Sequence, residues 1–231
     1  MSHLQIVTTA DGSNTIFNSE VGENYHSRHG ALQESRHVFL ESGLKYFLKV
    51  SPSGGDLEGA GAISILEVGF GTGLNFLLSA EYTIAQKIPL NYTGIEAYPL
   101  SPEMIAQTGY DQYIPKNLWQ QFIKHYEEAL QNPVQLDNCK LQIANCKLLD
   151  FSSSHKFDVI YFDAFAAIHQ PEMWDDHAIS HTLQFLKPGG VFVTYAITGN
   201  LKRIIKSLGL KVEKAPGAPG KREMLRAVKV E

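Results

Sequence analysis

The alternation of apolar and polar residues along this chain predicts repeated strand–helix units. Short apolar runs typical of buried strands lie at 63–68, 90–96, 139–143, 157–163 and 191–195. Segments with helical spacing separate them, at 74–80, in two patterns between 99 and 133, at 174–185 and at 199–208. Two more strands are predicted at 211–214 and 224–230. Strands that alternate with helices form a largely parallel sheet with helices on both faces, which is an α/β fold.

The first sixty residues follow a different pattern. Residues 4–17 predict a small hairpin that turns at Asp11-Gly12. Apolar positions at helical spacing from Ala31 predict a helix that runs to about Lys49, and the polar, Gly-rich stretch 51–61 predicts a loop. We therefore expect a single domain, 1–231, in which 1–60 forms an N-terminal hairpin and helix extension and 61–231 forms the core.

Three glycines, Gly69, Gly71 and Gly73, follow the strand 63–68 at every second position. Glycine allows positive φ and close approach of the backbone to a ligand, and the helix that follows begins with free N–H groups. A pyrophosphate-binding turn has the spacing G-x-G-x-x-G, whereas this chain has G-x-G-x-G preceded by Glu67. A carboxylate there repels pyrophosphate but suits a cation such as the amino group of S-adenosylmethionine (SAM). A tight turn without a ligand is the alternative.

Acidic residues end two of the predicted strands. Glu96 ends the strand 90–96, and Asp163 ends the strand 157–163. The carboxyl ends of parallel strands meet at one edge of the sheet, so both acids are expected beside the glycine loop. An acid about 20 residues after such a loop binds ribose hydroxyls, and Glu96 fits this role for a dinucleotide or for SAM.

Composition and charge exclude several classes of protein. The 231 residues carry a net charge of −4 and contain no apolar run long enough for a membrane span and no signal peptide. Cys139 and Cys146 match no zinc spacing, and His177 and His181 lack a third ligand. We expect a cytoplasmic protein with reduced cysteines and no metal. From Leu201 onward the chain has nine Lys or Arg residues and three Glu residues, so the C-terminal region carries a net positive charge.

Four motifs together resemble one known family over nearly the whole chain. They are Tyr-His-Ser-Arg at 25–28 with Gly-Ala-Leu-Gln-Glu at 30–34, Glu-Val-Gly-Phe-Gly-Thr-Gly-Leu-Asn-Phe at 67–76, Asp-Ala-Phe at 163–165 with Pro-Glu-Met-Trp at 171–174, and 216–224. The set is similar to the methyltransferase half of the bacterial bifunctional enzyme MnmC, whose stand-alone forms are called MnmD. The glycine loop alone indicates only a class I SAM-dependent methyltransferase.

The resemblance implies a fold, a cofactor and a reaction. The fold is the class I methyltransferase (Rossmann-like) sheet of seven strands, the last of them antiparallel, and the cofactor is SAM. The reaction is methylation of the 5-aminomethyl group of the wobble (2-thio)uridine in tRNA, which yields 5-methylaminomethyl-uridine. tRNA is the implied partner, and no membrane is involved. The bifunctional relatives also carry an FAD-dependent domain, for which this chain is too short.

The resemblance also implies roles for individual residues. Cofactor-binding residues are Tyr25, Glu67, Gly69, Phe70, Gly71, Thr72, Gly73, Asn75, Glu96, Asn145 and Cys146. Asp163, at the tip of its strand, can orient the amine and take its proton, so we assign it as the catalytic base; a helix N-cap or a loop brace is the alternative. Substrate-binding residues are Arg28, Glu34, Phe165, Trp174, Lys221 and Arg222. Phe165 and Trp174 stack on the uracil or pack in the core, and Lys221 and Arg222 contact tRNA phosphates or only solvate the surface; both alternatives stay open. Arg28 and Glu34 bind each other or the substrate.

The chain departs from the family pattern at two places. The motif Asp-Ala-Phe-x-Pro has alanine in place of proline, at Ala167. The acid expected to contact adenine near the end of the third strand is missing, and Asn145 and Cys146 stand there instead.

Three rival functions remain open from the sequence. A methyltransferase for a small-molecule amine, or an aminopropyl transferase of related fold, is disfavoured by the basic C-terminal region. An NAD-dependent oxidoreductase is disfavoured by the glycine spacing. A catalytically inactive tRNA-binding domain is disfavoured because Glu67, Glu96 and Asp163 are all present.

Overall fold

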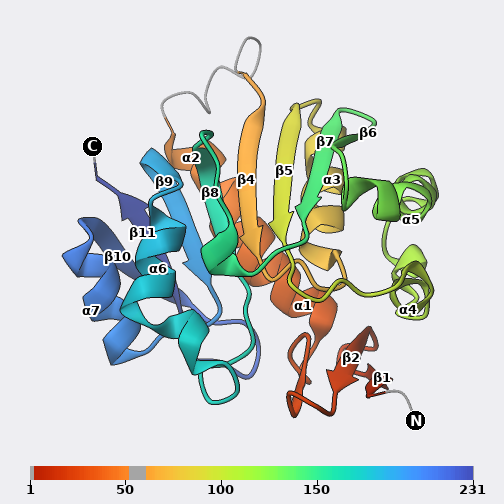
Figure 1. Ribbon diagram of the computed structural model, residues 1–231, viewed down its shortest axis with the longest axis horizontal. Helices are drawn as coiled ribbons and strands as arrows, with labels where there is room; N and C mark the ends of the chain where they lie inside the picture. Colours follow the sequence, from red (N-terminus) through yellow and green to blue (C-terminus); the bar gives the residue numbers. More distant parts are fainter. Residues whose placement is uncertain (1–2, 52–60, 231) are drawn as a thin grey trace.

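A mixed eight-stranded sheet forms the centre of the protein in the computed structural model, which describes residues 3–51 and 61–230 (Figure 1). Its strand order is β10-β11-β9-β8-β4-β5-β7-β6. The strands are β4 (Ile63–Val68), β5 (Leu90–Ile95), β6 (Val134–Leu136), β7 (Cys139–Ala144), β8 (Phe157–Phe162), β9 (Leu186–Thr194), β10 (Leu210–Pro216) and β11 (Glu223–Lys229). Strands β7, β5, β4, β8 and β9 are parallel, and β11 runs antiparallel between β9 and β10. This arrangement confirms the predicted fold class.

The sheet has one strand more than predicted. The additional strand, β6, has three residues and pairs antiparallel with β7 at the edge. Val134 and Leu136 are buried on either side of exposed Gln135. Three residues are too few for an alternating pattern to stand out in a sequence, which is why the strand was missed.

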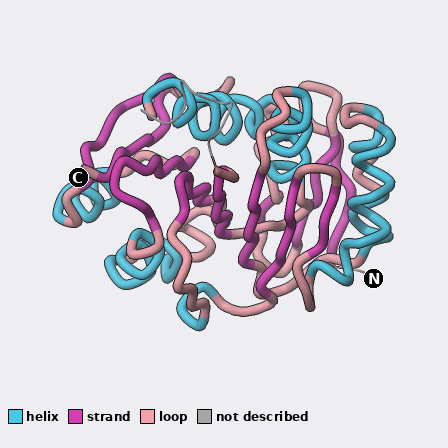
Figure 2. Tube along the Cα trace, turned by 90° about the horizontal axis from the view of Figure 1, so that it is seen from above, coloured by secondary structure: helices cyan, strands magenta, loops and turns pink. Residues whose placement is uncertain are grey.

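Helices cover both faces of the sheet (Figures 1 and 2). One face packs against the continuous helix α1 (Ala31–Ser35), η1 (Arg36–Lys45) and α2 (Tyr46–Val50), and against α3 (Leu74–Ala85) and α5 (Lys116–Ala129). The other face packs against α6 (Asp176–Leu183) and α7 (Gly199–Ser207). Shorter helical segments are α4 (Pro102–Ala106), η3 (Tyr110–Gln112), η4 (Leu148–Asp150) and η5 (Pro171–Trp174).

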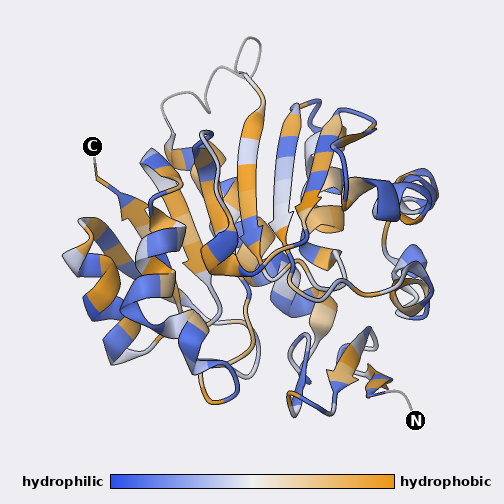
Figure 3. Ribbon diagram, viewed as in Figure 1, coloured by the Kyte–Doolittle hydropathy of each residue, from blue (hydrophilic) through white to orange (hydrophobic). Residues whose placement is uncertain are grey.

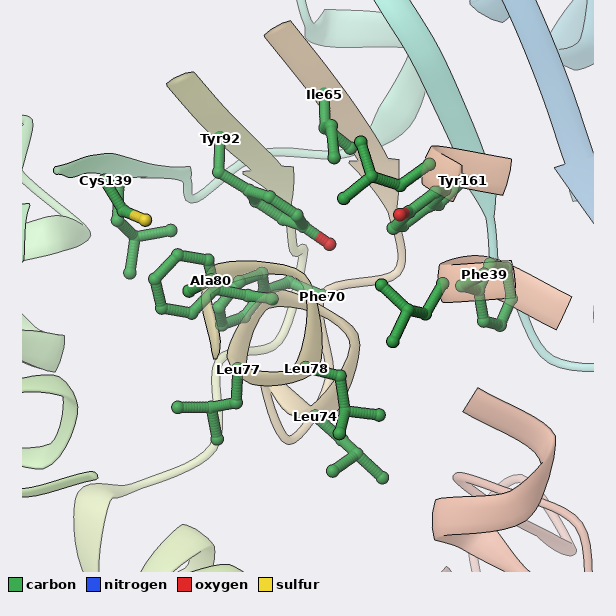
Figure 4. Close-up of a cluster of buried hydrophobic side chains, with 14 of the residues drawn as sticks. Phe39, Ile65, Phe70, Leu74, Leu77, Leu78, Ala80, Tyr92, Cys139 and Tyr161 are labelled. Atoms are coloured by element: carbon green, nitrogen blue, oxygen red, sulfur yellow. The ribbon is translucent and has the colours of Figure 1, made fainter. Parts of the chain in front are cut away.

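Side chains of successive residues in the central strands pack into two separate cores, one on each face of the sheet. Ile65 and Tyr161 belong to the core under α3, whereas Leu66 and Ile160 belong to the core under α6 and α7. The period of two in a strand sends neighbouring side chains to opposite faces. Apolar residues accordingly predominate in β4 and β8 (Figure 3), and Figure 4 shows Tyr92, Ile65 and Tyr161 of three strands facing α3.

The N-terminal segment forms the predicted hairpin and helix. Strands β1 (Leu4–Thr8) and β2 (Asn14–Asn18) pair antiparallel, and β3 (Glu23–Asn24) adds a short third strand. The long helix has a π-helical centre, η1. At Gly43 this helix packs closely against the sheet, because a Cβ on that glycine would lie 2.8 Å from Cε1 of Tyr161. The predicted loop 51–61 falls mostly on residues 52–60, outside the described part.

Two boundaries near the C-terminus differ from the prediction. β9 begins at Leu186 rather than Val191, since 187–190 continue beside β8 with a register shift. The helix predicted from Trp174 is instead the short turn η5 followed by α6, which begins where the Asp175 carboxylate accepts a hydrogen bond from the Ala178 N–H at 2.8 Å. An aspartate in this position stabilises a helix start.

Candidate active site

The carboxyl ends of β4, β5 and β8 meet as predicted and are joined by backbone hydrogen bonds. The N–H groups of Gly69 and Phe70 both donate to the Ile95 carbonyl, and the Asp163 N–H donates to the Val68 carbonyl at 2.9 Å. Gly69 has φ +83, and a Cβ on it would lie 2.4 Å from the Asp163 carbonyl oxygen. The glycine loop and the Asp163 loop thus touch, and only glycine fits at their contact.

Glu67 lies beneath the glycine loop and is completely buried. Its Oε1 accepts a hydrogen bond from Nδ2 of Asn75 at 2.7 Å, and its Oε2 accepts one from the Tyr92 hydroxyl at 2.8 Å. Burial, with the nearby Asp163 carboxyl, raises the pKa of Glu67 well above its usual range. The expectation that Glu67 binds a cationic ligand directly is therefore wrong for this geometry, because the carboxyl faces the protein interior.

Asp163 follows β8 and forms part of the wall of a pocket. Its Oδ2 accepts a hydrogen bond from the same Asn75 Nδ2, at 2.9 Å. Burial raises the pKa of Asp163 from 3.8 to about 8, and the neighbouring Glu34 carboxyl adds to the rise, while Asn75 and the Lys221 ammonium oppose it. A carboxyl with a pKa near neutrality accepts and releases protons readily at physiological pH, which is a property of general bases.

Glu96 follows β5 and closes the glycine loop from the other side. Its Oε2 accepts a hydrogen bond from the Gly71 N–H at 2.9 Å, and its Oε1 accepts one from the Tyr98 N–H at the same distance. The carboxylate is half-buried, and it retains lone pairs for further donors.

The Tyr25 ring lies between the glycine loop and Phe165, which lines the pocket. Tyr25 lies so close to Gly71 that a Cβ on that glycine would be 3.0 Å from Cδ1 of Tyr25. The Tyr25 and Phe165 rings meet edge to face with centroids 5.1 Å apart. Tyr25 is therefore in contact with both the loop and the pocket wall.

The pocket has a volume of about 270 Å³ and combines aromatic rings with ionisable groups. Its aromatic walls are Tyr25, Phe165 and Tyr195, and its carboxyl groups are Glu23, Glu34 and Asp163. Glu23 also accepts a hydrogen bond from the Ala166 N–H at 2.8 Å, which braces the loop that lacks the expected proline. Aromatic faces and carboxylates both attract cations, so the lining suits an alkylammonium group.

Lys221 lines one wall of this pocket, and its side chain is partly exposed. Its Nζ lies 2.8 Å from Oε1 of Glu34 and 3.9 Å from the centre of the Tyr195 ring. Oε2 of Glu34 accepts a hydrogen bond from the Ser27 N–H. Lys221 is thus already paired with Glu34, and a contact of Lys221 with phosphate stays a prediction. Glu34 likewise pairs with Lys221 and not with Arg28.

The remaining predicted residues separate into exposed and buried sets. Arg28 and Arg222 are exposed, and Arg28 lies on the pocket rim. Trp174 is only 7% exposed, and its Nε1–H donates to the Phe165 carbonyl at 2.8 Å, so it packs in the core and cannot stack on a base. Phe70 is also a core side chain, with its ring against Phe76 and Tyr126.

Five further predicted positions lie in the glycine loop, at the start of α3 or just after β7. Gly73 has φ +77 and caps α3, and Thr72 and Asn75 are buried. The Asn75 side chain points to the two carboxyl groups and not to the loop surface. Asn145 is exposed and Cys146 half-buried at the end of β7, where an adenine contact stays a prediction.

Sequence reasoning missed three residues of the site. Tyr195 lies at the carboxyl end of β9, so the rule that placed Glu96 and Asp163 also pointed to it. Glu23 and Tyr92 gave no such signal: Glu23 lies in β3, a strand of only two residues, and Tyr92 lies inside a buried strand. Among the described residues no cluster of three or more His, Cys, Asp or Glu is arranged to hold a metal ion. Within the same residues, no helix has both the length and the apolar character to cross a bilayer.

Comparison with known families identifies the chain. A family described as S-adenosyl-L-methionine-dependent methyltransferase matches residues 111–230, which is more than half of the 231 residues. The chain belongs to this methyltransferase family. SAM is accordingly its cofactor, as the loop Glu67–Gly73 predicted.

Individual relatives of this methyltransferase confirm the resemblance to MnmC. The tRNA 5-methylaminomethyl-2-thiouridine biosynthesis bifunctional protein MnmC of Methylobacillus flagellatus is 31% identical over 90% of this chain, and that of Pseudomonas fluorescens is 29% identical over 87%. The chain spans about a third of the length of these relatives, 33% and 31%. The crystal structure of MNMC2 from Aquifex aeolicus is similar in fold, with a TM-score of 0.76, 23% identity and coverage of 98% of this chain and 70% of that chain.

Proposed function

We propose that this methyltransferase converts the 5-aminomethyl group of the wobble (2-thio)uridine of tRNA to 5-methylaminomethyl. One observation carries the proposal. Asp163 contacts the glycine loop through its backbone and a cation-attracting pocket through its carboxyl, so a single residue joins the cofactor side to the amine side. The names of the MnmC relatives, which state tRNA 5-methylaminomethyl-2-thiouridine biosynthesis, support the choice of substrate.

The residues around the glycine loop fit SAM. A Cβ at Gly69 would collide with the Asp163 carbonyl, and one at Gly71 would press on Tyr25, so the loop presents bare backbone at this edge. Glu96 has lone pairs free for ribose hydroxyls, and Tyr25 lies where it can cover the methionine part of the cofactor. Bound SAM supplies a methyl group on a positively charged sulfur, which is already activated for transfer to a nucleophile.

The chain itself must orient an amine and remove its proton. A primary alkylamine reaches the protein as an ammonium ion, which the carboxylates and aromatic faces of the pocket attract. The ionised form of Asp163, whose share grows as the pH rises towards its pKa of about 8, accepts a proton from the nitrogen and leaves the amine neutral and nucleophilic. Positioning supplies roughly 7–11 kcal/mol of the barrier reduction, and a placed base adds about 10²–10⁴-fold.

The rim of the pocket supplies contacts for the rest of a nucleotide. Phe165 is half-buried on the pocket wall, where its ring meets the face of a splayed uracil. Arg28 lines the pocket, Arg222 follows the pocket residue Lys221 in the chain, and both are exposed and available to bind phosphate groups. Arg222 was predicted in this role together with Lys221, and Arg28 was predicted to bind the substrate.

Methyl-labelled SAM tests the proposal. The protein is incubated with tRNA that carries 5-aminomethyl-uridine at the wobble position and, as a control, with the same tRNA carrying plain uridine there. We expect label in the first tRNA and none in the second. Label in neither tRNA, together with rapid methylation of small primary amines, would establish the alternative function, a small-molecule amine methyltransferase.

A further inference from the structure

We infer that Asn75 is a positioning residue: its carboxamide orients the Asp163 carboxyl and fixes it to the helix that carries the glycine loop. The inference deepens the proposed function and rests on it for the role of Asp163 as a base. The hydrogen-bond geometry of Asn75 itself does not depend on the substrate.

The amide group of Asn75 lies between two carboxyl groups. Nδ2 donates to Oε1 of Glu67 at 2.7 Å and to Oδ2 of Asp163 at 2.9 Å. An amide nitrogen has two N–H donors, and both are used here. The opposite orientation would place the amide oxygen against the Asp163 carboxylate whenever Asp163 is ionised, and the two oxygens would repel each other. The ionised state of Asp163 therefore favours the orientation in which Nδ2 faces it.

The acceptor of the same amide is left without a partner. Asn75 is 3% exposed, and among the described residues no donor reaches its buried Oδ1. Buried polar atoms are usually hydrogen-bonded, and an exception calls for an explanation. Here the explanation is that both N–H groups are directed at the carboxyls, and the carbonyl oxygen has to point away from them.

Asp163 depends on this one contact for its orientation. Within residues 3–51 and 61–230, Asn75 is the only group that donates a hydrogen bond to the Asp163 carboxyl. Asn75 is itself held by Glu67, which is held by the Tyr92 hydroxyl. The chain Tyr92–Glu67–Asn75–Asp163 runs through β5, β4 and α3 to the end of β8, and these are rigid, buried elements.

The contact links the proposed base to the cofactor side of the site. Asn75 is two residues beyond Gly73, the last glycine of the loop, in the first turn of α3. A movement of this helix end therefore displaces the loop and Asp163 together. Reacting groups must be placed to within a fraction of an ångström for efficient transfer. The shared helix end keeps the glycine loop and Asp163 at a fixed distance from each other.

The ionisation of Asp163 also depends on Asn75. A hydrogen bond donated to a carboxylate favours its charged form. The titratable groups that face Asp163 from the surrounding elements are Glu23, Glu34, Glu67, Tyr92, Tyr195 and Lys221. Of these, Lys221 lowers the pKa of Asp163, as Asn75 does, whereas burial and the carboxyls Glu34 and Glu23 raise it.

The unmodified protein provides the first test. NMR of the full chain labelled with ¹³C at the Asp carboxyls and ¹⁵N at the Asn side chains follows both groups against pH without tRNA. We expect the Asn75 amide protons to shift with the same apparent pKa as the Asp163 carboxyl carbon, which Asp163→Asn assigns. Independent titration of the two would overturn the inference even if the protein methylates tRNA.

Variants provide the second test. Asn75→Leu keeps a similar volume and removes both donors; Thr83→Val removes a buried hydroxyl from the same helix, two turns further on, and is the control. We expect Asn75→Leu to raise the pKa of Asp163 by about one unit and to lower kcat at least tenfold at pH 7, with a smaller loss above pH 9.

The readouts of the variant test separate the two claims. Unchanged Asp163 titration and unchanged turnover in Asn75→Leu would overturn the inference. Should this variant fail to fold, the titration of the unmodified protein decides. If the Asn75 amide and the Asp163 carboxyl titrate together in a protein that does not methylate tRNA, the proposed function is wrong. The inferred link between Asn75 and Asp163 would still hold.

Discussion

Lys221 and Glu34 are 187 residues apart in the chain, yet their side chains form an ion pair of 2.8 Å at the wall of the pocket. The pair joins the C-terminal segment before β11 to the first helix. The Glu34 side chain is 9% exposed and that of Lys221 33%, so solvent screens the attraction only in part. The pocket is thus formed by both ends of the chain, and the Lys221–Glu34 pair holds them together.

Loss of this pair is expected to destabilise the fold. Lys221→Met keeps the aliphatic stem and leaves the Glu34 carboxylate buried without a counter-charge, so we expect a loss of about 1–3 kcal/mol in the free energy of unfolding. Urea unfolding measures it. Glu34→Gln combined with Lys221→Met should recover part of the loss. Lys214→Met breaks the more exposed pair with Glu223 and should cost less than about 1 kcal/mol; equal losses in the two lysine variants would refute the argument.

The pH dependence follows from Asp163. Its pKa in the folded protein is about 8, raised from 3.8 chiefly by burial. The base works only when ionised, so turnover should rise with pH up to about 8 and level off above it. Asp163→Asn should lower kcat by about 10²–10⁴-fold and change SAM affinity only a few-fold. Near parental turnover in this variant would reduce Asp163 to a structural role.

The same shift predicts a stability change of known sign. Between pH 4 and 8 the folded protein binds a proton at Asp163 that the unfolded chain releases, so stability falls as pH rises through this window. Asp163→Asn removes that dependence. Its Tm should exceed that of the parent by more at pH 9 than at pH 5, as calorimetry can measure. A difference that is the same at both pH values would contradict the raised pKa.

SAM binding depends on the bare backbone of Gly71. Its φ is +53, and a Cβ would meet the Tyr25 ring at 3.0 Å. Gly71→Ala should weaken SAM binding at least tenfold in calorimetric titration. Gly189→Ala is the matched control, since Gly189 also has positive φ, +72, but has open space around its Cβ position. Equal weakening by both variants would indicate general strain and not a ligand-binding loop.

Substitutions of Phe165 and Trp174 should have different effects, the first on tRNA binding and the second on stability. Phe165 lines the pocket, so Phe165→Ala is expected to raise the KM for tRNA, by an amount that corresponds to about 1–3 kcal/mol of stacking. Trp174→Phe loses the hydrogen bond to the Phe165 carbonyl and core volume, so it should lower Tm more than Phe165→Ala does. The assignment fails if Trp174→Phe raises KM for tRNA at unchanged Tm.

The exposed arginines are expected to hold the tRNA backbone. Replacing Arg28 and Arg222 together by Ala should flatten the plot of log affinity against log salt by about one to two units, because each phosphate contact releases counterions. SAM affinity should not change. The double variant of exposed Lys116 and Lys124 on α5 removes the same charge and should leave the slope within a few tenths of the parent. An equal flattening of the salt slope by both double variants would show that tRNA responds to the overall positive charge and not to contacts with Arg28 and Arg222.

The strands and their carboxyl ends could be read from the sequence because both depend on local pattern. An apolar run of six residues identified β4, and the geometry of parallel strands placed Glu96 and Asp163 beside the glycine loop. Contacts between distant segments gave no local signal. Tyr92 can donate to Glu67 because the pairing of β4 with β5 places the two residues diagonally across neighbouring strands. The Lys221–Glu34 pair depends on the whole fold. Phe165 and Trp174 are both aromatic residues, and only packing separates their roles.

The most direct test of the account is the identity of the methylated nucleoside. tRNA that carries 5-aminomethyl-uridine at the wobble position is reacted with SAM and the parent protein, digested, and analysed by mass spectrometry, with Asp163→Asn in parallel. The account predicts that the parent converts this nucleoside to its 5-methylaminomethyl form, one methyl group heavier, and that Asp163→Asn leaves it unchanged. An unmethylated wobble nucleoside after reaction with folded, SAM-binding parent protein would contradict the account.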